Sequence, residues 1–251
     1  MKPLDMERRV IEAAEALARS LGSNPNHTVA AAAMDTNGQI HTAVNVHHFT
    51  GGPCAELVAL GVAATAEAGP LVAMAAAGDG GRGLLSPCGR CRQVMLDLHP
   101  DILVAVPTVD GPRMRPIAKL LSDTYFFPDA QAGRVFRFNR SHYDAITSGQ
   151  KTSSVRWDER IALGPAIFYF EDDVKCPPLR GEILEIQRYQ INDLTPERLR
   201  LSNGGTVEGY LEGLRRHYPA MPADAFVDVV DFQVTPSGSA HSREPQNTTA
   251  Q

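Results

Sequence analysis

Apolar and charged side chains alternate with the period of a helix at the start of the chain. Apolar residues recur at intervals of three and four positions, with Glu and Arg between them, and a glycine follows. This spacing predicts an amphipathic helix over residues 5–21. Two strand-like apolar runs come next, over residues 28–34 and 40–46, and the Asn37-Gly38 step between them predicts a β-hairpin.

Helical and strand-like patterns continue to alternate through the rest of the first half. In chain order they predict a helix over residues 54–68, a strand over 71–77, a helix over 86–98, a strand over 102–106 and a short helix over 117–121. Pro53 is expected in the first turn of one helix, and Ser86 at the N-cap of another. This order predicts an α/β fold in which helices cover the faces of a sheet.

The pattern changes after a polar stretch that contains a proline and a glycine. Beyond it, short strands are predicted over residues 135–138, 166–170, 183–186 and 226–234, and helices over 141–148 and 207–218. These elements are typical of a smaller α+β or barrel-like module. A chain of 251 residues suits two domains. We place them at residues 1–128 and 134–234, with a linker at 129–133, and expect the polar residues 235–251 to be disordered.

The composition narrows the class of protein. Hydrophobic residues make up 43% and charged residues 21% of the chain, as in folded globular proteins. No stretch approaches the roughly 20 apolar residues of a membrane span, and the first residues do not resemble a signal peptide. We therefore expect a cytoplasmic protein that has no membrane partner. The net charge of −5 disfavours a general affinity for nucleic acid and favours a small-molecule partner.

Three of the four cysteines, Cys54, Cys88 and Cys91, lie close together in the sequence, which suits a metal site better than disulfides. Cys88 and Cys91 are three positions apart at a predicted helix start, so both sulfurs can reach one ion. Helix N-termini favour thiolates. We predict one Zn²⁺ per chain, with the fourth ligand position open to water. Glu56 is the expected general base toward that water.

Three thiolates on a divalent ion leave a net negative charge. Arg90, which lies between two of the cysteines, or Arg82 is expected to offset it by donating to a sulfur. A solvated helix residue is the alternative interpretation of Arg90. A zinc ion that only stabilises the domain is the alternative to catalysis, but it leaves Glu56 and the open ligand position unexplained.

Residues 44–57 contain Pro-Cys-Ala-Glu, and residues 82–94 contain Ser-Pro-Cys-Gly-Arg-Cys-Arg-Gln. Through these stretches, residues 1–128 resemble the cytidine deaminase family, and within it the blasticidin-S deaminases most closely. The resemblance implies a three-layer α/β/α fold and a homotetramer. It also implies hydrolytic deamination at C4 of a cytosine nucleoside or nucleoside antibiotic, with Glu56 protonating N3 and then the leaving amine.

The resemblance also suggests substrate contacts. Asn45 matches the residue that holds a ribose hydroxyl in cytidine deaminases. Thr28, Arg82 and Tyr125 fall where blasticidin-S deaminase holds its substrate, and Arg82 would suit a carboxylate. His47 stands where cytidine deaminases carry a Glu that binds the sugar, which argues against plain cytidine. Packing inside the domain is the alternative role of Thr28 and Tyr125.

Residues 134–234 resemble the ASCH domains, which are small PUA-like barrels linked with RNA. The resemblance is carried mainly by residues 137–156. It places Lys151 and Ser154 where some members have the Lys and Thr of an amidohydrolase acting on N-acetylated cytidine, although the matching Glu is missing. Lys151, Ser154 and Arg156 are expected to form a small cationic cleft that binds RNA or a modified cytidine, coupled to the deaminase. The alternative is a solvated face with Lys151 in an ion pair.

Four more arginines add to the cationic character of the second half. They are Arg134, Arg137, Arg140 and Arg160. Together with the cleft, they predict a locally basic face in an otherwise acidic chain.

Overall fold

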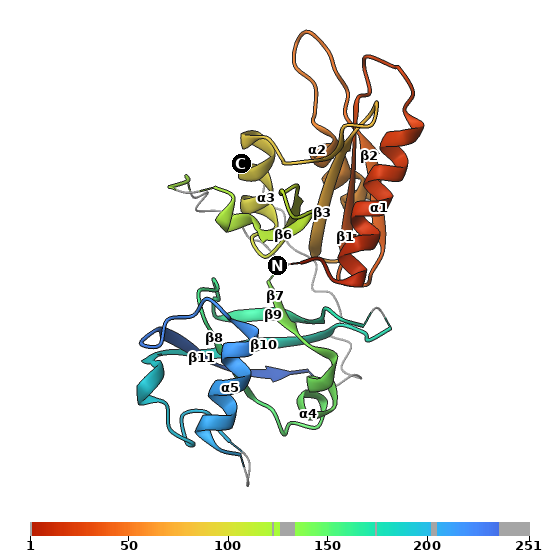
Figure 1. Ribbon diagram of the computed structural model, residues 1–251. Coiled ribbons are helices and arrows are strands. Elements are labelled where there is room, and N and C mark those ends of the chain that lie inside the picture. The colour runs from red at the N-terminus through yellow and green to blue at the C-terminus, as the bar shows by residue number, and fades with distance from the viewer. Residues whose placement is uncertain (1, 122, 126–133, 174, 202–204, 236–251) are drawn as a thin grey trace.

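The computed structural model describes residues 2–121, 123–125, 134–173, 175–201 and 205–235. Within these ranges the chain forms two sheets, one in each half (Figure 1). The predicted linker at 129–133 and nearly all of the predicted disordered tail lie outside the described residues. The domain boundaries therefore remain a prediction.

The first sheet is mixed and contains six strands in the order β2-β1-β3-β5-β6, with β4 paired to β3. The strands are β1 (Val29–Asp35), β2 (Ile40–Val44), β3 (Leu71–Gly78), β4 (Gly83–Leu85), β5 (Leu103–Val106) and β6 (Arg113–Pro116). Strands β3 and β5 are parallel, and the other pairs are antiparallel. The predicted β1–β2 hairpin is present. The short strands β4 and β6 were not predicted.

Helices cover both faces of this sheet (Figure 1). They are α1 (Asp5–Ser20), α2 (Ala55–Thr65) and α3 (Gly89–Leu98), and a 3-10 turn, η1, spans Ile117–Lys119. Alternate residues of β1 belong to opposite layers: Ala30 and Ala32 pack with α1, while Ala31 and Ala33 pack with α2 and α3. This arrangement confirms the predicted three-layer fold.

The starts of two helices lie one and three residues after the predicted positions. Cys54 and Cys88 are the N-caps of α2 and α3, so Pro53 precedes its helix and Ser86 lies outside the other. The two metal-site cysteines therefore stand directly at helix N-termini.

The second sheet contains five strands in the order β7-β9-β10-β11-β8. The elements are β7 (Val135–Phe138), α4 (Tyr143–Thr147), β8 (Ser153–Arg156), β9 (Gly164–Phe170), β10 (Leu179–Gln190), α5 (Val207–His217) and β11 (Phe226–Val234), with 3-10 turns η2 (Arg140–His142) and η3 (Ile191–Asp193). Strand β10 is longer than predicted. Helix α4 is shorter than predicted, because its expected first turn is the 3-10 turn η2.

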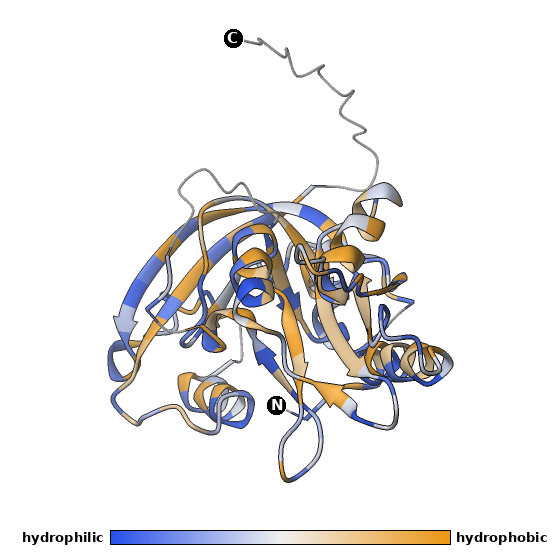
Figure 2. Cartoon of the chain, turned by 90° about the horizontal axis from the view of Figure 1, so that it is seen from above, coloured by the Kyte–Doolittle hydropathy of each residue, from blue (hydrophilic) through white to orange (hydrophobic). Residues whose placement is uncertain are grey.

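The second sheet curls into a half-barrel around phenylalanine side chains. Phe136, Phe168 and Phe232 pack edge-on or tilted with ring centroids 5.0 to 5.8 Å apart. Figure 2 shows hydrophobic and hydrophilic stretches in turn along the long curved strands. Strands β7 and β8 are the two edges of this sheet and do not pair with each other.

The two halves contact each other through Tyr169 and Val135, which pack with the core of the first half, and through polar groups. The Arg137 guanidinium donates to the carbonyl oxygens of Val72 (2.8 Å) and Asp101 (3.1 Å). The Asp101 carboxylate accepts from the Val135 backbone N–H at 3.0 Å. These bonds join β7 to the ends of β3 and β5. Among the described helices, none is long and apolar enough to cross a membrane.

Candidate active site

Three cysteine sulfurs converge where α2 and α3 begin. The Cys88 Sγ lies 3.7 Å from the Cys54 Sγ and 3.5 Å from the Cys91 Sγ. All three sulfurs lie within 4.8 Å of one another. A tetrahedral zinc ion with Zn–S bonds of about 2.3 Å holds its sulfur ligands about 3.8 Å apart. The spacing and chemistry of this donor set therefore fit one zinc ion.

Backbone contacts hold the Cys54 segment in place. The Val46 N–H, just after β2, donates to the Pro53 carbonyl at 3.1 Å. From α3, the Arg90 guanidinium donates to the Gly52 carbonyl at 3.0 Å. Arg90 thus supports the zinc site through the backbone that precedes Cys54, and the predicted bond to a sulfur is not among its contacts in the structure.

A second arginine, missed in the sequence analysis, holds the other cysteine segment. The Arg92 guanidinium donates to the carbonyls of Pro87 and Leu120, each at 2.9 Å. It joins the residue before Cys88 to the end of the first half. The feature of the sequence that could have indicated this role is that Arg92 directly follows the ligand Cys91.

The helix N-terminus stabilises a thiolate at Cys88. Burial alone would raise the pKa of this thiol, but hydrogen bonds from the backbone N–H groups of Cys91 and Arg90 and from the neighbouring thiols outweigh it, so the pKa is lowered. Burial raises the pKa of the Cys54 and Cys91 thiols. A cation bound between the three sulfurs would favour the thiolate form of all three cysteines.

Glu56 lies in the first turn of α2, directly beside the cysteines. Its side chain is buried, with only 5% of the residue exposed. Burial raises the pKa of its carboxyl group, and a hydrogen bond from the Cys91 thiol partly opposes this. Among the described residues, the metal-capable cluster consists of the cysteines alone. Glu56 is thus a buried carboxyl group that lies next to the metal site and is not part of the cysteine cluster.

Three of the predicted substrate residues meet around Thr28, just before β1. The Asn45 side-chain oxygen accepts from the backbone N–H groups of Thr28 (2.7 Å) and Val29 (2.8 Å). The Arg82 guanidinium donates to the Thr28 carbonyl and forms an ion pair with Asp79 at 2.6 Å. The structure therefore brings Thr28, Asn45 and Arg82 together where β1 begins and β2 and β3 end.

Tyr125 lies beside α3 and is 67% exposed, which excludes core packing as its role. The Gln93 amide donates to the Tyr125 carbonyl at 2.9 Å and accepts from the Thr124 hydroxyl at 2.6 Å. Gln93 is a second residue that the sequence analysis missed, and it follows Cys91 by two positions. Through this bond the backbone of Tyr125 is held beside α3.

Comparisons with known proteins agree with this geometry. Residues 5–106 match the family model for the cytidine and deoxycytidylate deaminase zinc-binding region. Over 104 residues the chain is 36% identical to a cytidine deaminase of Mycobacterium tuberculosis, which covers 40% of this chain and 74% of the relative.

Two kinds of solved structure match parts of this chain. A crystal structure of cytidine deaminase from Mycobacterium tuberculosis has 32% identity and a TM-score of 0.40, and the match covers 50% of this chain and all of that one. An ASCH domain from Lactobacillus crispatus has 14% identity and a TM-score of 0.33, with 40% of this chain and 78% of that chain covered. The matching zinc-binding region and the identity to the curated relative assign this chain, through its first half, to the cytidine deaminase family.

Proposed function

We propose that the protein deaminates a cytosine ring at C4, in a free nucleoside or in a cytosine-nucleoside antibiotic related to blasticidin S. The observation that carries this proposal is the buried Glu56 carboxyl beside three cysteine sulfurs spaced for zinc. When bound, zinc supplies a Lewis acid that activates water at neutral pH. Hydrolytic deamination needs such a water and one group that moves protons.

Three side chains around this centre have separate roles in the proposed reaction. Glu56 takes up a proton and delivers it first to N3 of the ring and then to the leaving amine. The side-chain oxygen of Asn45 accepts hydrogen bonds from the backbone at the start of β1. Its side-chain N–H groups are therefore available to a sugar hydroxyl. Arg82 keeps its Nη1 without a partner among the described residues, and this nitrogen would receive a substrate carboxylate.

The substrate is tested with a panel of cytidine, deoxycytidine and blasticidin S, followed by loss of the cytosine absorbance. We expect turnover of blasticidin S, with a kcat/KM at least about tenfold above that for cytidine, because His47 offers no carboxylate to a ribose. His47→Glu should raise kcat/KM for cytidine, and His48→Glu, at the adjacent exposed histidine, should not. A zinc-loaded protein that converts none of the three compounds would contradict the proposal.

We also propose that the chain assembles as a homo-oligomer, a tetramer by its resemblance to the family. The outer face of α2 consists of Gly61, Val62, Ala64 and Thr65, which are exposed, and it carries no charge. The apolar residue Val62 has 39% of its surface exposed. A helix at a solvated surface usually presents charged residues to water, so this face fits a subunit contact.

The charged variant Val62→Glu is expected to shift the molar mass measured by light scattering from an oligomer towards a monomer or dimer. A charge placed in an apolar contact costs several kcal/mol unless it is paired. Val109→Glu is the control, since Val109 is fully exposed on a loop. A wild-type protein that is monomeric at micromolar concentration would refute the assembly.

The alternative function, RNA binding or modified-cytidine binding by the second half, receives less support. Two arginines of the predicted basic face are used inside the protein: Arg137 binds backbone carbonyls, and Arg140 lies near Asp144 and Asp173. The alternative interpretation of Lys151, a solvated residue in an ion pair, finds no such pair among the described residues. A cytoplasmic location remains our proposal, because a set of reduced thiols suits a reducing compartment.

A further inference from the structure

The loop that joins β3 to β4 holds Arg82 against its own backbone. The arginine side chain folds back over Gly78, where an added Cβ would lie 2.8 Å from the Arg82 Nε and 2.9 Å from its Cζ. The loop then turns through Gly80 and Gly81, whose φ angles are positive, at 55° and 78°. The close approach and the positive φ angles both favour glycine at these positions. The loop therefore fixes where the guanidinium lies.

Asp79 occupies much of the hydrogen-bonding capacity of this guanidinium. Its Oδ1 accepts from the Arg82 Nε at 3.2 Å and from Nη2 at 2.6 Å. Because Nη2 also donates to the Thr28 carbonyl, both of its N–H groups are used. Among the described residues, Nη1 has no partner. The guanidinium therefore offers one free nitrogen to a ligand.

One free nitrogen is too few for the strongest kind of carboxylate recognition. A bidentate contact uses two neighbouring nitrogens of the guanidinium, either Nε with Nη2 or Nη1 with Nη2. Both combinations include Nη2, which is already bonded to Asp79 and Thr28. A substrate carboxylate would therefore bind Arg82 through Nη1 alone.

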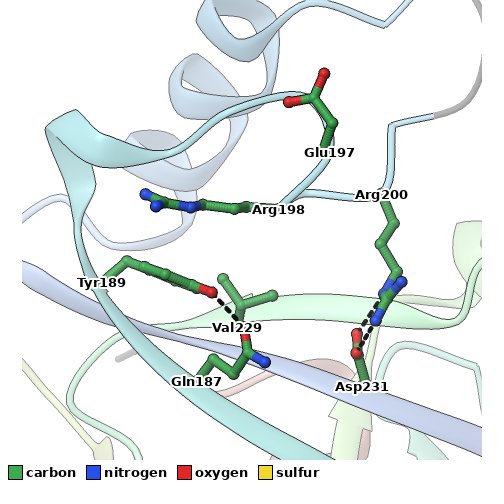
Figure 3. A pocket seen from close by; sticks show the side chains of 7 residues that line it. All are labelled: Gln187, Tyr189, Glu197, Arg198, Arg200, Val229 and Asp231. Carbon is green, nitrogen blue, oxygen red and sulfur yellow. Dashed lines mark hydrogen bonds and ion pairs between the residues drawn. The ribbon is translucent and has the colours of Figure 1, made fainter.

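Another arginine–aspartate pair, in the second half, has the bidentate geometry (Figure 3). Arg200 donates from Nε to Oδ1 of Asp231 at 2.8 Å and from Nη2 to Oδ2. The two pairs are exposed to a similar degree, since the arginine side chains are 53% and 47% exposed and the aspartates 16% and 18%. What distinguishes Arg82 is that its nitrogens are divided between Asp79 and the Thr28 carbonyl, which ties the pair to the start of β1.

The pair also meets Asn45 at the backbone of Thr28. The Thr28 carbonyl accepts from the Asp79 backbone N–H at 3.0 Å as well as from Arg82, and the Thr28 N–H donates to the Asn45 side-chain oxygen at 2.7 Å. One residue after Asn45, the backbone bonds to the segment that precedes the zinc ligand Cys54. A sugar held by Asn45 would thus lie near one positive and one negative charge, whose sum is zero.

We propose that Asp79 is a specificity-determining residue, which neutralises Arg82 and so lets the site accept a cytosine nucleoside whether its sugar carries a hydroxyl or a carboxylate group. The inference rests on the proposed binding of the sugar beside Asn45 and Arg82. A carboxylate bound to Nη1 is attracted by Arg82 and repelled by Asp79, and the two effects oppose each other. An uncharged hydroxyl is affected little by either charge.

The inference is tested with uridine and uridine 5′-carboxylate, which differ by one charge on the sugar and cannot be deaminated. Calorimetric titration of the zinc-loaded full chain should give wild-type Kd values within about threefold of each other. Asp79→Asn keeps an oxygen that can accept from Arg82 but removes the negative charge. It should tighten binding of the carboxylate by about tenfold, the effect of one nearby charge at a partly exposed site, and change uridine binding by less than about twofold.

Two further variants serve as controls. Asp110→Asn removes the same charge from another pair with i,i+3 spacing, Asp110 and Arg113 at 3.7 Å, and should leave both Kd values unchanged. The double variant Asp79→Asn/Arg82→Gln should lose the tenfold gain, because the unpaired charge belongs to Arg82. Added salt should weaken binding of the carboxylate more in Asp79→Asn than in wild type, since it screens that charge.

The outcomes separate this inference from the proposed deamination. An equal change for both ligands in Asp79→Asn would show a purely structural role and overturn the inference, as would a gain that persists in the double variant or a wild-type protein that binds neither ligand. If cytidine or blasticidin S is deaminated while these titrations fail, the proposed function stands and only the role of Asp79 is refuted. A zinc-loaded protein that deaminates nothing contradicts the proposed function whatever the titrations show.

Discussion

Replacing Glu56 by glutamine is expected to lower kcat for cytosine deamination by about 10²- to 10⁴-fold, the usual contribution of a general acid–base group. The amide keeps the size of the side chain but cannot take up and return a proton. Because Glu56 is buried next to Cys91, no solvent-exposed carboxylate can replace it. The rate is measured by loss of the cytosine absorbance, and the bound zinc by elemental analysis.

Zinc content separates the two roles that Glu56 could have. We expect Glu56→Gln to keep its metal, because the cysteine sulfurs alone are spaced for the ion. Glu67→Gln, at an exposed carboxylate just beyond α2, is the matched control and should retain full activity. Normal turnover by Glu56→Gln would refute its role in proton transfer, and loss of zinc would assign it to the metal site instead.

Replacing Cys88 by alanine is expected to abolish both zinc binding and deamination. The Cys88 sulfur lies next to both other sulfurs, at 3.7 and 3.5 Å, so its loss leaves two ligands that cannot enclose the ion. Zinc also stabilises the folded state. A ligand present at 100 times its Kd adds about 2.7 kcal/mol, so the variant should unfold at a lower temperature than the zinc-loaded protein.

Cys176 provides the matched control for this experiment. Unlike the exposed Cys88, it is buried, and it lies in the core of the second half, away from the zinc ligands. Cys176→Ala should bind one zinc ion per chain and retain activity. If Cys88→Ala keeps a full equivalent of zinc, the three-cysteine site is wrong.

The sequence predicted most elements of the first half because each has a local signal. Helix α1 repeats apolar residues at helical spacing, and the Asn37-Gly38 step marks the hairpin. Strands β4 and β6 have three and four residues, which is too short for a period to be visible. The N-cap of α3 is Cys88 and not the predicted Ser86. A serine before a proline has the sequence pattern of an N-cap, and only the path of the folded chain shows that the helix begins later.

The sequence by itself determined the metal chemistry. Two ligands are three residues apart, and the third precedes the acidic residue Glu56 by two positions, so their types and spacing define a zinc site before any folding. The tertiary structure decided what the arginines do. Arg90, Arg82 and Arg137 bind carbonyl groups 38, 54 and 65 residues away in the chain.

The physical reason for this difference between cysteines and arginines is how far each side chain extends from its own backbone. A cysteine ligand acts within a few ångströms of its own backbone, so local spacing fixes its role. An arginine carries its charge at the end of a long, flexible side chain, and its partners depend on which strands the fold brings beside it. The hydrogen bond from Arg156 on β8 to the Arg137 carbonyl on β7 therefore became visible only in the folded sheet.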